Sequence, residues 1–597
     1  MLFDVFRAVK DSKDVQSLLD VLTSLVNPFG DDSTLLSLSS GAVADQQTTT
    51  DLLTAKEIGE NRLDGFVKER LIDKSVDFFA AIKTAKLKTF AGTSKRKTAK
   101  PEYQVIKSDR SLFIQLLMVA KERDLDLKQI LSYSLSPVPG CLSSSDLTSI
   151  AKTTKSSLLK HMETVVPDCQ LHIKPAECAV VIDAMALIQS LPSQRLPGKF
   201  GAFAELVLER SFQIAKQFNG TRVDLVGDRY DANSIKDVER RRRNQSAQQF
   251  KIDRPDQALP VQWKEFLRSG ANKAVLQSFL SRQLPLQQPK EMMTMVLAME
   301  YEVRKCTFKP GAATITEDLP YLKSDHEEAD TRLLLHANDC ASSSNTVVIW
   351  SPDTDVAVIG IGLADKISAN VLFATGTGKN QRLLDLTKIS HNIGQLAPVL
   401  PQLHAFTGCD TTSSFYGKGK KAAFTLAKAN DDHITTLQLL GKEFALPSLP
   451  PGIEKLTCAL YGSSSSNIND ARFDAFKNGT TEKALPPNAD CLLLHTKRAN
   501  YQSKIWLSAL QPMIAAESPV GNGWEEEGGE LKIKWMDGPS APKSVMQTTK
   551  CQCKANPCTG NRCSCLKAGM KCTALCGCRD CNNRSVAMDS EEESDDD

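Results

Sequence analysis

The stretch Val347-Val-Ile-Trp-Ser-Pro-Asp-Thr-Asp355 joins a short apolar run to two carboxylates that follow it directly. An apolar run of this length, bounded by turn residues, is typical of a fully buried parallel strand. Ala179-Val-Val-Ile-Asp183 and Val223-Asp-Leu-Val-Gly-Asp228 repeat the arrangement. In open α/β sheets the functional crevice lies outside the carboxyl ends of the strands. We therefore expect these acids to meet at one edge of a sheet.

Seven carboxylates fit this scheme: Asp183, Asp228, Glu328, Asp330, Asp353, Asp355 and Asp410. Two carboxylates about 4 Å apart repel each other by roughly 4 kcal/mol at an effective dielectric of 20. A crowded group of them therefore indicates divalent cations, and oxygen ligands suit Mg²⁺ or Mn²⁺. The alternative is that each acid is a separate cap or turn residue, because Asp is common after strands. The paired spacings Glu328-Ala-Asp330 and Asp353-Thr-Asp355 favour the shared metal site.

Three segments resemble the flap endonuclease and exonuclease-1 group of the PIN-like nucleases. His326-Glu-Glu-Ala-Asp-Thr-Arg-Leu-Leu-Leu335 looks like the acidic helix of that group, and Val347-Val-Ile-Trp-Ser-Pro-Asp-Thr-Asp-Val356 is similar to its strand ending in Asp-Ser-Asp. Leu403-His-Ala-Phe-Thr-Gly-Cys-Asp410, followed by Gly417-Lys-Gly-Lys-Lys-Ala422, resembles its Gly-Cys-Asp segment and helical hairpin. The resemblance covers residues 176–430 and implies an α/β fold with a mostly parallel sheet and flanking helices.

The resemblance also implies a two-metal phosphodiesterase that is structure- or end-specific, with DNA as substrate; the sequence does not separate DNA from RNA. In such enzymes two ions activate a water and stabilise the leaving oxygen. By carry-over, Asp355 and Asp410 complete the second Mg²⁺ or Mn²⁺ site. The first ion is held by Asp183, Asp228, Glu328, Asp330 and Asp353. The rival interpretation is a non-enzymatic DNA-binding or chromatin protein with an inactive PIN-like core.

Two basic segments are candidates for phosphate contact. The start of a helix offers free N–H groups to phosphate, and the residues there are Gly417, Gly419, Lys420 and Lys421. An ordinary Gly-rich cap with solvated lysines is the alternative. Between Asp228 and Glu328 the resemblance implies a strand-threading arch, and this stretch contains Arg241 and Arg242 in a run of four arginines. Such runs are also typical of a solvated helix face or a localisation signal.

The C-terminal region is dense in cysteine. Nine of the 17 cysteines are Cys551, Cys553, Cys558, Cys563, Cys565, Cys572, Cys576, Cys578 and Cys581. Disulfides need an oxidising compartment, and Met1-Leu-Phe-Asp lacks the basic start of a secretion signal. Zinc is the better explanation, because nine thiolates can complete three tetrahedral sites if three of them bridge.

The cysteine spacing resembles that of the tesmin/TSO1-like CXC domain. This resemblance implies three structural Zn²⁺ ions and DNA as a partner, with Lys554 and Arg562 as candidate phosphate or groove contacts. Arg562 stands where that family commonly has Tyr; an Arg can enter a narrow minor groove, but the resemblance then no longer implies sequence-specific reading. The alternatives are a purely structural zinc knot or a protein-docking module.

The composition, 41% hydrophobic and 24% charged residues, indicates an ordinary globular chain of several domains without a membrane span. The chain looks like uncharacterised proteins of animal mobile elements, and a nuclear location is expected. The predicted divisions are an N-terminal region with linkers (1–100), a helical region (101–175), the PIN-like core (176–430), a helical extension (431–515), a linker (516–550), the zinc module (551–584) and an acidic, disordered tail (585–597).

Overall fold

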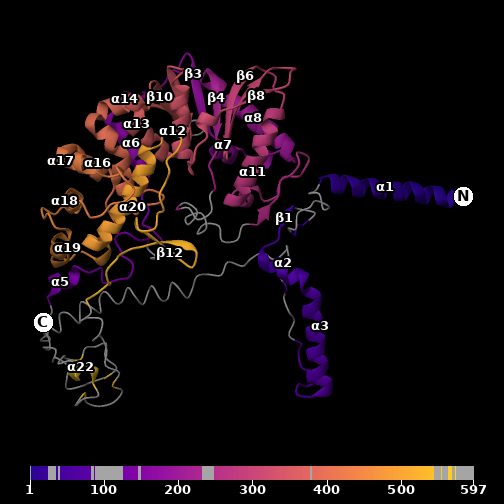
Figure 1. The fold of residues 1–597 in the computed structure, drawn as a ribbon, viewed down its shortest axis with the longest axis horizontal. Helices are drawn as coiled ribbons and strands as arrows, with labels where there is room; N and C mark the ends of the chain where they lie inside the picture. The colour runs from indigo at the N-terminus through magenta and orange to yellow at the C-terminus, as the bar shows by residue number, and fades with distance from the viewer. Residues whose placement is uncertain are drawn as a thin grey trace, which may run out of the picture.

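The structure is a computed structural model, and it describes residues 2–24, 35–37, 41–82, 87, 126–144, 149–230, 235, 248–376, 380–542, 553, 558, 563–567, 572 and 578. Its main body is α/β, with a large mixed sheet between two layers of helices (Figure 1). The sheet has nine strands in the order β2-β11-β10-β9-β3-β4-β6-β7-β8.

The centre of the sheet is parallel and its two edges are antiparallel. The parallel strands are β3 (Cys178–Asp183), β4 (Gly220–Val226), β6 (Met293–Met299), β9 (Thr346–Trp350) and β10 (Asn370–Thr375). The antiparallel strands are β2 (Gln170–Leu171), β11 (Arg382–Asp385), β7 (Glu302–Phe308) and β8 (Ile315–Asp318). The parallel sheet that we expected from the sequence thus corresponds to the central strands of the observed sheet. The strands β7, β8 and β11 each follow their neighbouring strand after a short connection, which permits only antiparallel pairing, and β2 extends one edge by pairing with β11.

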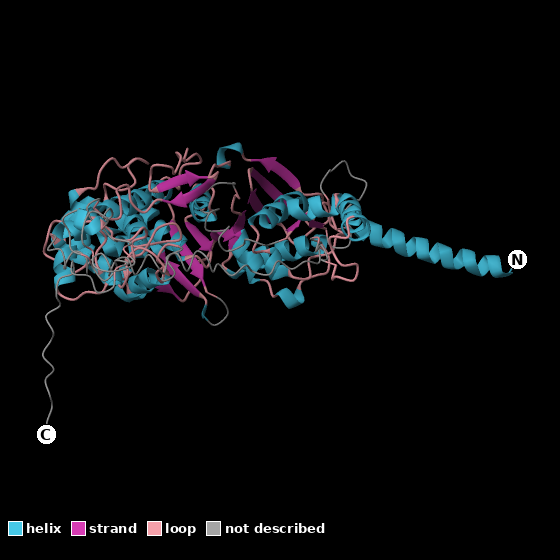
Figure 2. Ribbon diagram, turned by 90° about the horizontal axis from the view of Figure 1, so that it is seen from below, coloured by secondary structure: helices cyan, strands magenta, loops and turns pink. Residues whose placement is uncertain are grey.

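Alternating side chains of the strands face two different helical layers. Ala179 and Val181 of β3 belong to one hydrophobic cluster, whereas Val180 and Ile182 belong to the other, as the two-residue period of a strand requires. The second cluster contains the helices α7 (Ala184–Ser190), α8 (Phe200–Gln217), α10 (Trp263–Phe266) and α11 (Gly270–Gln283). The first cluster contains α6 (Ser156–Val165), α12 (Ala329–Cys340), α13 (Thr354–Leu363), α14 (Leu386–Ile393), α15 (Leu400–Phe406) and α16 (Lys420–Ala429). Figure 2 shows the strands between these helices.

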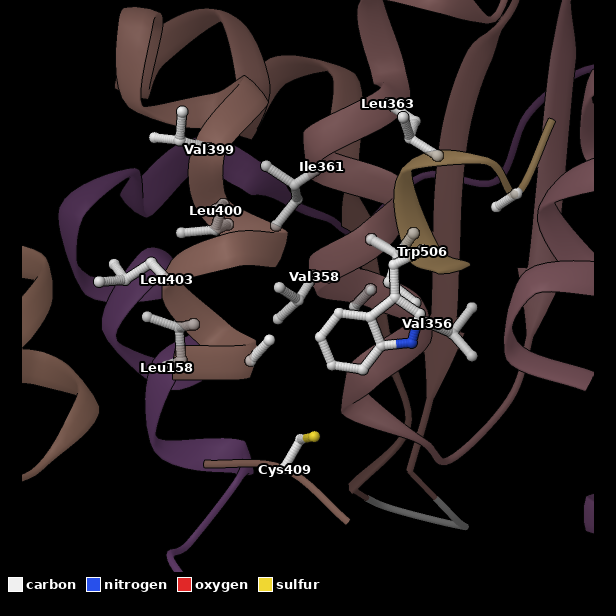
Figure 3. Close-up of a cluster of buried hydrophobic side chains, with 14 of the residues drawn as sticks. Leu158, Val356, Val358, Ile361, Leu363, Val399, Leu400, Leu403, Cys409 and Trp506 are labelled. Carbon is white, nitrogen blue, oxygen red and sulfur yellow. The ribbon is translucent and has the colours of Figure 1, made fainter. Parts of the chain in front are cut away.

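The hydrophobic core extends past both expected boundaries of residues 176–430. Leu158 of α6 and Trp506 of α20 (Ala489–Leu507) lie in one buried cluster with Val358 of α13 (Figure 3). The helices after residue 430 that join this cluster are α17 (Asp431–Leu437), α18 (Pro451–Leu460), α19 (Ile468–Lys477) and α20 (Ala489–Leu507). Residues 156–175 and 431–509 are therefore part of the same folded body.

Part of the expected linker at 516–550 is folded. The strands β12 (Trp524–Glu527) and β13 (Glu530–Ile533) form an antiparallel hairpin. Trp524 is buried and its ring lies 5.6 Å from that of Tyr501 on α20. Arg498 of α20 donates hydrogen bonds to the carbonyl oxygens of Gly523 and Lys534. This Gly- and Glu-rich stretch therefore forms a hairpin rather than a linker, because the buried Trp524 packs against Tyr501 of α20.

The described part of the stretch between Asp228 and Glu328 contains strands as well as helices, whereas the arginine run at 240–243 lies outside the described residues. The described residues 248–327 provide α10, α11 and the strands β6, β7 and β8, where an arch was expected. A further short strand, β5 (Gln249–Phe250), pairs with β1 (Ala42–Val43).

The N-terminal helices are α1 (Leu2–Ser24), α2 (Gln46–Leu53), α3 (Ala55–Phe66) with a π-helical continuation over Val67–Ile72, and α5 (Leu127–Leu131). Of these, α1 and α3 project from the body of the molecule (Figure 1). No helix in the described part of the chain has the length and apolar character needed to cross a membrane.

Candidate metal centre

Asp183 stands at the junction between β3 and α7. Its side chain accepts a hydrogen bond from the backbone N–H of Ala186 at 2.9 Å and another from the Ser351 hydroxyl at 3.2 Å. Burial, together with the negative charges of Asp228 and Asp353, raises the pKa of Asp183 to about 7. Asp183 thus lies close to carboxylates that are 45 and 170 residues away along the chain.

Asp228 follows β4 and joins this strand to the acidic helix. Its Oδ1 accepts from the backbone N–H of Ala329 at 2.8 Å, and its Oδ2 accepts from the Tyr230 hydroxyl at 3.1 Å. Glu328 is the residue before the first turn of α12, and Asp330 lies in that turn. Both acids are buried at 7–8% exposure. The hydrogen bond from Ala329 to Asp228 therefore places the start of α12, with Glu328 and Asp330, beside the acid that follows β4.

Asp353 and Asp355 begin α13 directly after β9. Asp353 accepts a hydrogen bond from the backbone N–H of Asp355 at 3.0 Å. Carboxylate oxygens of Asp330, Asp353 and Asp355 lie within 4.8 Å of one another. Hard divalent cations such as Mg²⁺ and Mn²⁺ prefer oxygen ligands of this kind. This triad fits such an ion.

Asp355 is the most enclosed acid of the group, at 1% exposure. Its Oδ1 accepts from His404 Nε2 at 2.9 Å, and its Oδ2 accepts from Lys155 Nζ at 2.8 Å. Burial alone would raise the pKa of Asp355, but His404 and Lys155 together hold it well below its usual range. Burial lowers the pKa of His404 to about 4. His404 is therefore neutral near pH 7 and donates its Nε2 hydrogen to Asp355.

Asp410 comes from a loop after α15, not from the end of a strand. Lys155 Nζ forms an ion pair with its Oδ2 at 2.7 Å, which links Asp410 to Asp355. Gly408 shapes this loop with φ +106°, and a Cβ there would lie 2.8 Å from the backbone of Ser414. Only glycine tolerates both conditions. Asp410 is thus connected to Asp355 through Lys155, which comes from a different segment of the chain.

The expected phosphate-binding turn lies at the start of α16, but one of its lysines points inward. Lys420 is 1% exposed and donates to the carbonyl oxygen of His404 at 2.9 Å and to the Thr407 hydroxyl at 3.0 Å. Burial lowers the pKa of Lys420 to about 7. The prediction that Lys420 contacts phosphate is wrong for this reason. Gly417, Gly419 and Lys421 are exposed.

A buried charged network, which was not predicted from the sequence, links α12 to β4. Asp224 lies in the middle of β4 with no exposure. It accepts two hydrogen bonds from Arg222 at 2.7 and 2.8 Å, and His336 of α12 contacts it at 2.7 Å. Arg222 also pairs with Asp339 on α12 at 2.6 Å. The sequence signal for this network is a charged residue, Asp224, inside an apolar strand. Its partners Arg222 and His336 link α12 to β4.

The cysteine region contains a separate candidate metal centre. Sulfurs of Cys553, Cys558 and Cys563 lie within 4.8 Å of one another, as do those of Cys558, Cys572 and Cys578. The Sγ atoms of Cys563 and Cys572 are 3.7 Å apart. Two thiolates on one tetrahedral zinc, each with a bond of about 2.3 Å, are separated by about 3.8 Å. The donor set fits zinc, and Cys558 occurs in both groups as a bridging ligand would.

Several predicted contacts lie outside the described residues. They are Arg241, Arg242, Cys551, Lys554, Arg562, Cys576, Cys581 and the acidic tail at 585–597, together with the side chain of Cys565.

Comparisons with known proteins add little to this geometry. Residues 3–134 match the family model described as a domain of unknown function, DUF8702. No curated protein matches the chain. Among solved structures, the chain is similar to the catalytic core of Rad2 in complex with DNA substrate, with 12% identity and a TM-score of 0.27 over 54% of this chain and 75% of that one. The class that the fold and the two sites define is a mixed α/β protein with a carboxylate cluster and a cysteine cluster.

Proposed function

We propose that this protein is a divalent-metal-dependent phosphodiesterase with a PIN-like core that cleaves DNA. The observation that carries the proposal is the meeting of acids from β3, β4, α12 and α13 at the ends of parallel strands. The oxygens of Asp330, Asp353 and Asp355 lie within 4.8 Å of one another, and Asp183 is close enough to Asp228 and Asp353 for their charges to raise its pKa. This set of oxygen donors suits Mg²⁺ or Mn²⁺.

The residues of the cluster would have different roles in such a site. Asp183, Asp228, Glu328, Asp330 and Asp353 would hold the divalent metal, which supplies Lewis acidity for attack on a phosphodiester. Ser351 and the first N–H groups of α7 and α12 orient Asp183 and Asp228 by hydrogen bonds. His404 fixes the rotamer of Asp355. Asp183 must lose its proton before it can bind a cation.

We assign the cysteine cluster a docking role on duplex DNA, with structural zinc and a nuclear location. The paired groups of three cysteines that share Cys558 support zinc. The basic residues among these cysteines favour phosphate contact.

The catalytic proposal is tested by cleavage of flapped, branched and linear DNA in Mn²⁺. Asp228→Asn and Asp353→Asn should each lower turnover by at least about 100-fold, because even partners that only orient metal ligands cost 10- to 100-fold. Asp365→Asn is the matched control, since Asp365 is an exposed acid beyond the end of α13. Equal turnover in all four proteins would contradict the catalytic role. No turnover of any substrate by the wild type would instead favour a non-enzymatic DNA-binding protein.

The docking proposal is tested on the C-terminal region. Native mass spectrometry should find three zinc ions per chain, and fewer than two would overturn the bridged cluster. Deletion of residues 546–597 should weaken DNA binding and reduce its salt dependence, because each phosphate contact releases counterions. Unchanged affinity after the deletion would remove the docking role while leaving the carboxylate site untouched.

A further inference from the structure

Lys155 occupies an unexpected position inside the carboxylate cluster. Its Nζ lies 2.8 Å from Asp355 Oδ2 and 2.7 Å from Asp410 Oδ2. These are the two acids that the family resemblance assigns to a second divalent ion. With His404 on its Oδ1, Asp355 has both oxygens in contact with a donor from this chain.

The position of Lys155 is fixed by the fold. The carbonyl oxygen of Ala151, four residues earlier, accepts hydrogen bonds from both the N–H and the hydroxyl of Ser414 at 2.8 and 3.1 Å. The segment before Lys155 is thereby tied to the loop that follows Asp410. On the other side, Leu158 and Leu159 of α6 are buried at 0–1% exposure. The lysine side chain is itself only 21% exposed.

The charges around Lys155 match those around a bound cation. Asp355 and Asp410 contribute two negative charges, and both contact Lys155. A lysine amine is ordinarily an ammonium ion at neutral pH, and this one lies between the two carboxylates. A divalent ion between the same two acids would have to displace this ammonium group or tolerate its repulsion.

We propose that Lys155 takes the place of the second divalent ion, so that the carboxylate cluster binds one metal ion together with one ammonium group. The inference rests on the proposed metal-dependent function and specifies its cation requirement. The single ion then belongs to Asp183, Asp228, Glu328, Asp330 and Asp353. Asp355 lies within 4.8 Å of Asp330 and Asp353, but its two oxygens are engaged by His404 and Lys155.

The experiment counts Mn²⁺ ions in the cluster of the full-length, zinc-loaded chain. Equilibrium titration gives the number bound, and the electron paramagnetic resonance spectrum separates an isolated ion from a magnetically coupled pair. Lys155→Met removes the ammonium group and keeps the length of the side chain. Lys155→Arg keeps the charge, and Lys160→Met, at an exposed position of α6, is the matched control. The double variant with Asp228→Asn and Asp353→Asn defines the background from other sites.

We expect one isolated Mn²⁺ above background in the wild type, in Lys155→Arg and in Lys160→Met, and a coupled pair in Lys155→Met. A coupled pair in the wild type would overturn the role of Lys155 while leaving the metal-dependent function intact. One isolated ion in Lys155→Met would also overturn it. No ion above background in the wild type would overturn the proposed function itself. If Lys155→Met does not fold, the wild-type count still decides between one ion and two.

Discussion

Asp183 is a buried carboxyl whose charge should control the cluster near neutral pH. Its folded-state pKa of about 7 lies above the unfolded value of about 3.9. The folded state therefore holds an extra proton between these values, and stability should fall as pH rises through about 4 to 7 when no divalent ion is added. Asp183→Asn should remove this part of the slope. The measurement is urea unfolding of zinc-loaded protein across that window.

Asp365→Asn is the control for this titration and should keep the wild-type slope. An unchanged slope in Asp183→Asn would show that another group titrates. If the phosphodiesterase proposal holds, cleavage should rise with pH over the same window, because Asp183 binds a cation only after losing its proton.

Single residues of the site differ in how far the sequence could predict them. Asp183, Asp228 and Asp353 were predictable, because each ends or closely follows a strand that an apolar run indicates. Lys155 was not, since it follows the polar stretch Lys152-Thr-Thr and its partners are 200 and 255 residues away. Lys420 was predicted wrongly for a different reason: a lysine at a helix start normally faces solvent, but this one donates to buried oxygens of His404 and Thr407 at the C-terminal end of α15.

Among the elements, α12 depends on its contact with β4 through the Asp224 network. Asp224→Ala would leave Arg222 and His336 without their buried partner, and we expect a loss of about 3–5 kcal/mol in the free energy of unfolding. Chemical denaturation measures this loss. The control is Asp318→Ala, because Asp318 forms an exposed pair with Arg304 on the edge of the sheet and should cost no more than about 1 kcal/mol. Equal losses in the two variants would contradict the structural role of the network.

Strands and helices were predictable where sequence pattern and burial agree. Apolar runs indicated β3, β4 and β9, and helical spacing indicated α8 and α12. The strand β6 has the same apolar character and is followed directly by Glu300, but the resemblance implied an arch in this stretch rather than a strand. The hairpin β12–β13 was missed because Gly and Glu dominate its sequence, while a single buried Trp524 decides its packing.

The body of the molecule folds around one continuous set of helices that ends near residue 509. A chain of residues 126–542 should therefore fold, whereas a chain of residues 126–430 should not. The shorter chain loses Leu492 and Trp506 of α20, which lie buried against the layer that contains α13 and α15. Circular dichroism and limited proteolysis distinguish the two cases. Cooperative unfolding of the shorter chain would contradict this prediction and restore the boundary that the sequence suggested.

The limits of the body could not be read from the sequence, because they depend on contacts between distant segments. The resemblance ended at residue 430, yet α15 packs against α20, and α6 from the region before the sheet packs against α13 and α16. Helical pattern alone indicated these helices but not their shared core.

Asp183 and Asp353 also act as local folding signals, because each accepts a backbone N–H of the helix that it begins. Asn caps a helix about as well as Asp, whereas Ala costs about 0.5–2 kcal/mol. Selection on stability alone would thus retain Asp or Asn at both positions. In a homologue that has lost the proposed metal-dependent activity, we expect substitutions first at acids that do not cap a helix, such as Asp410.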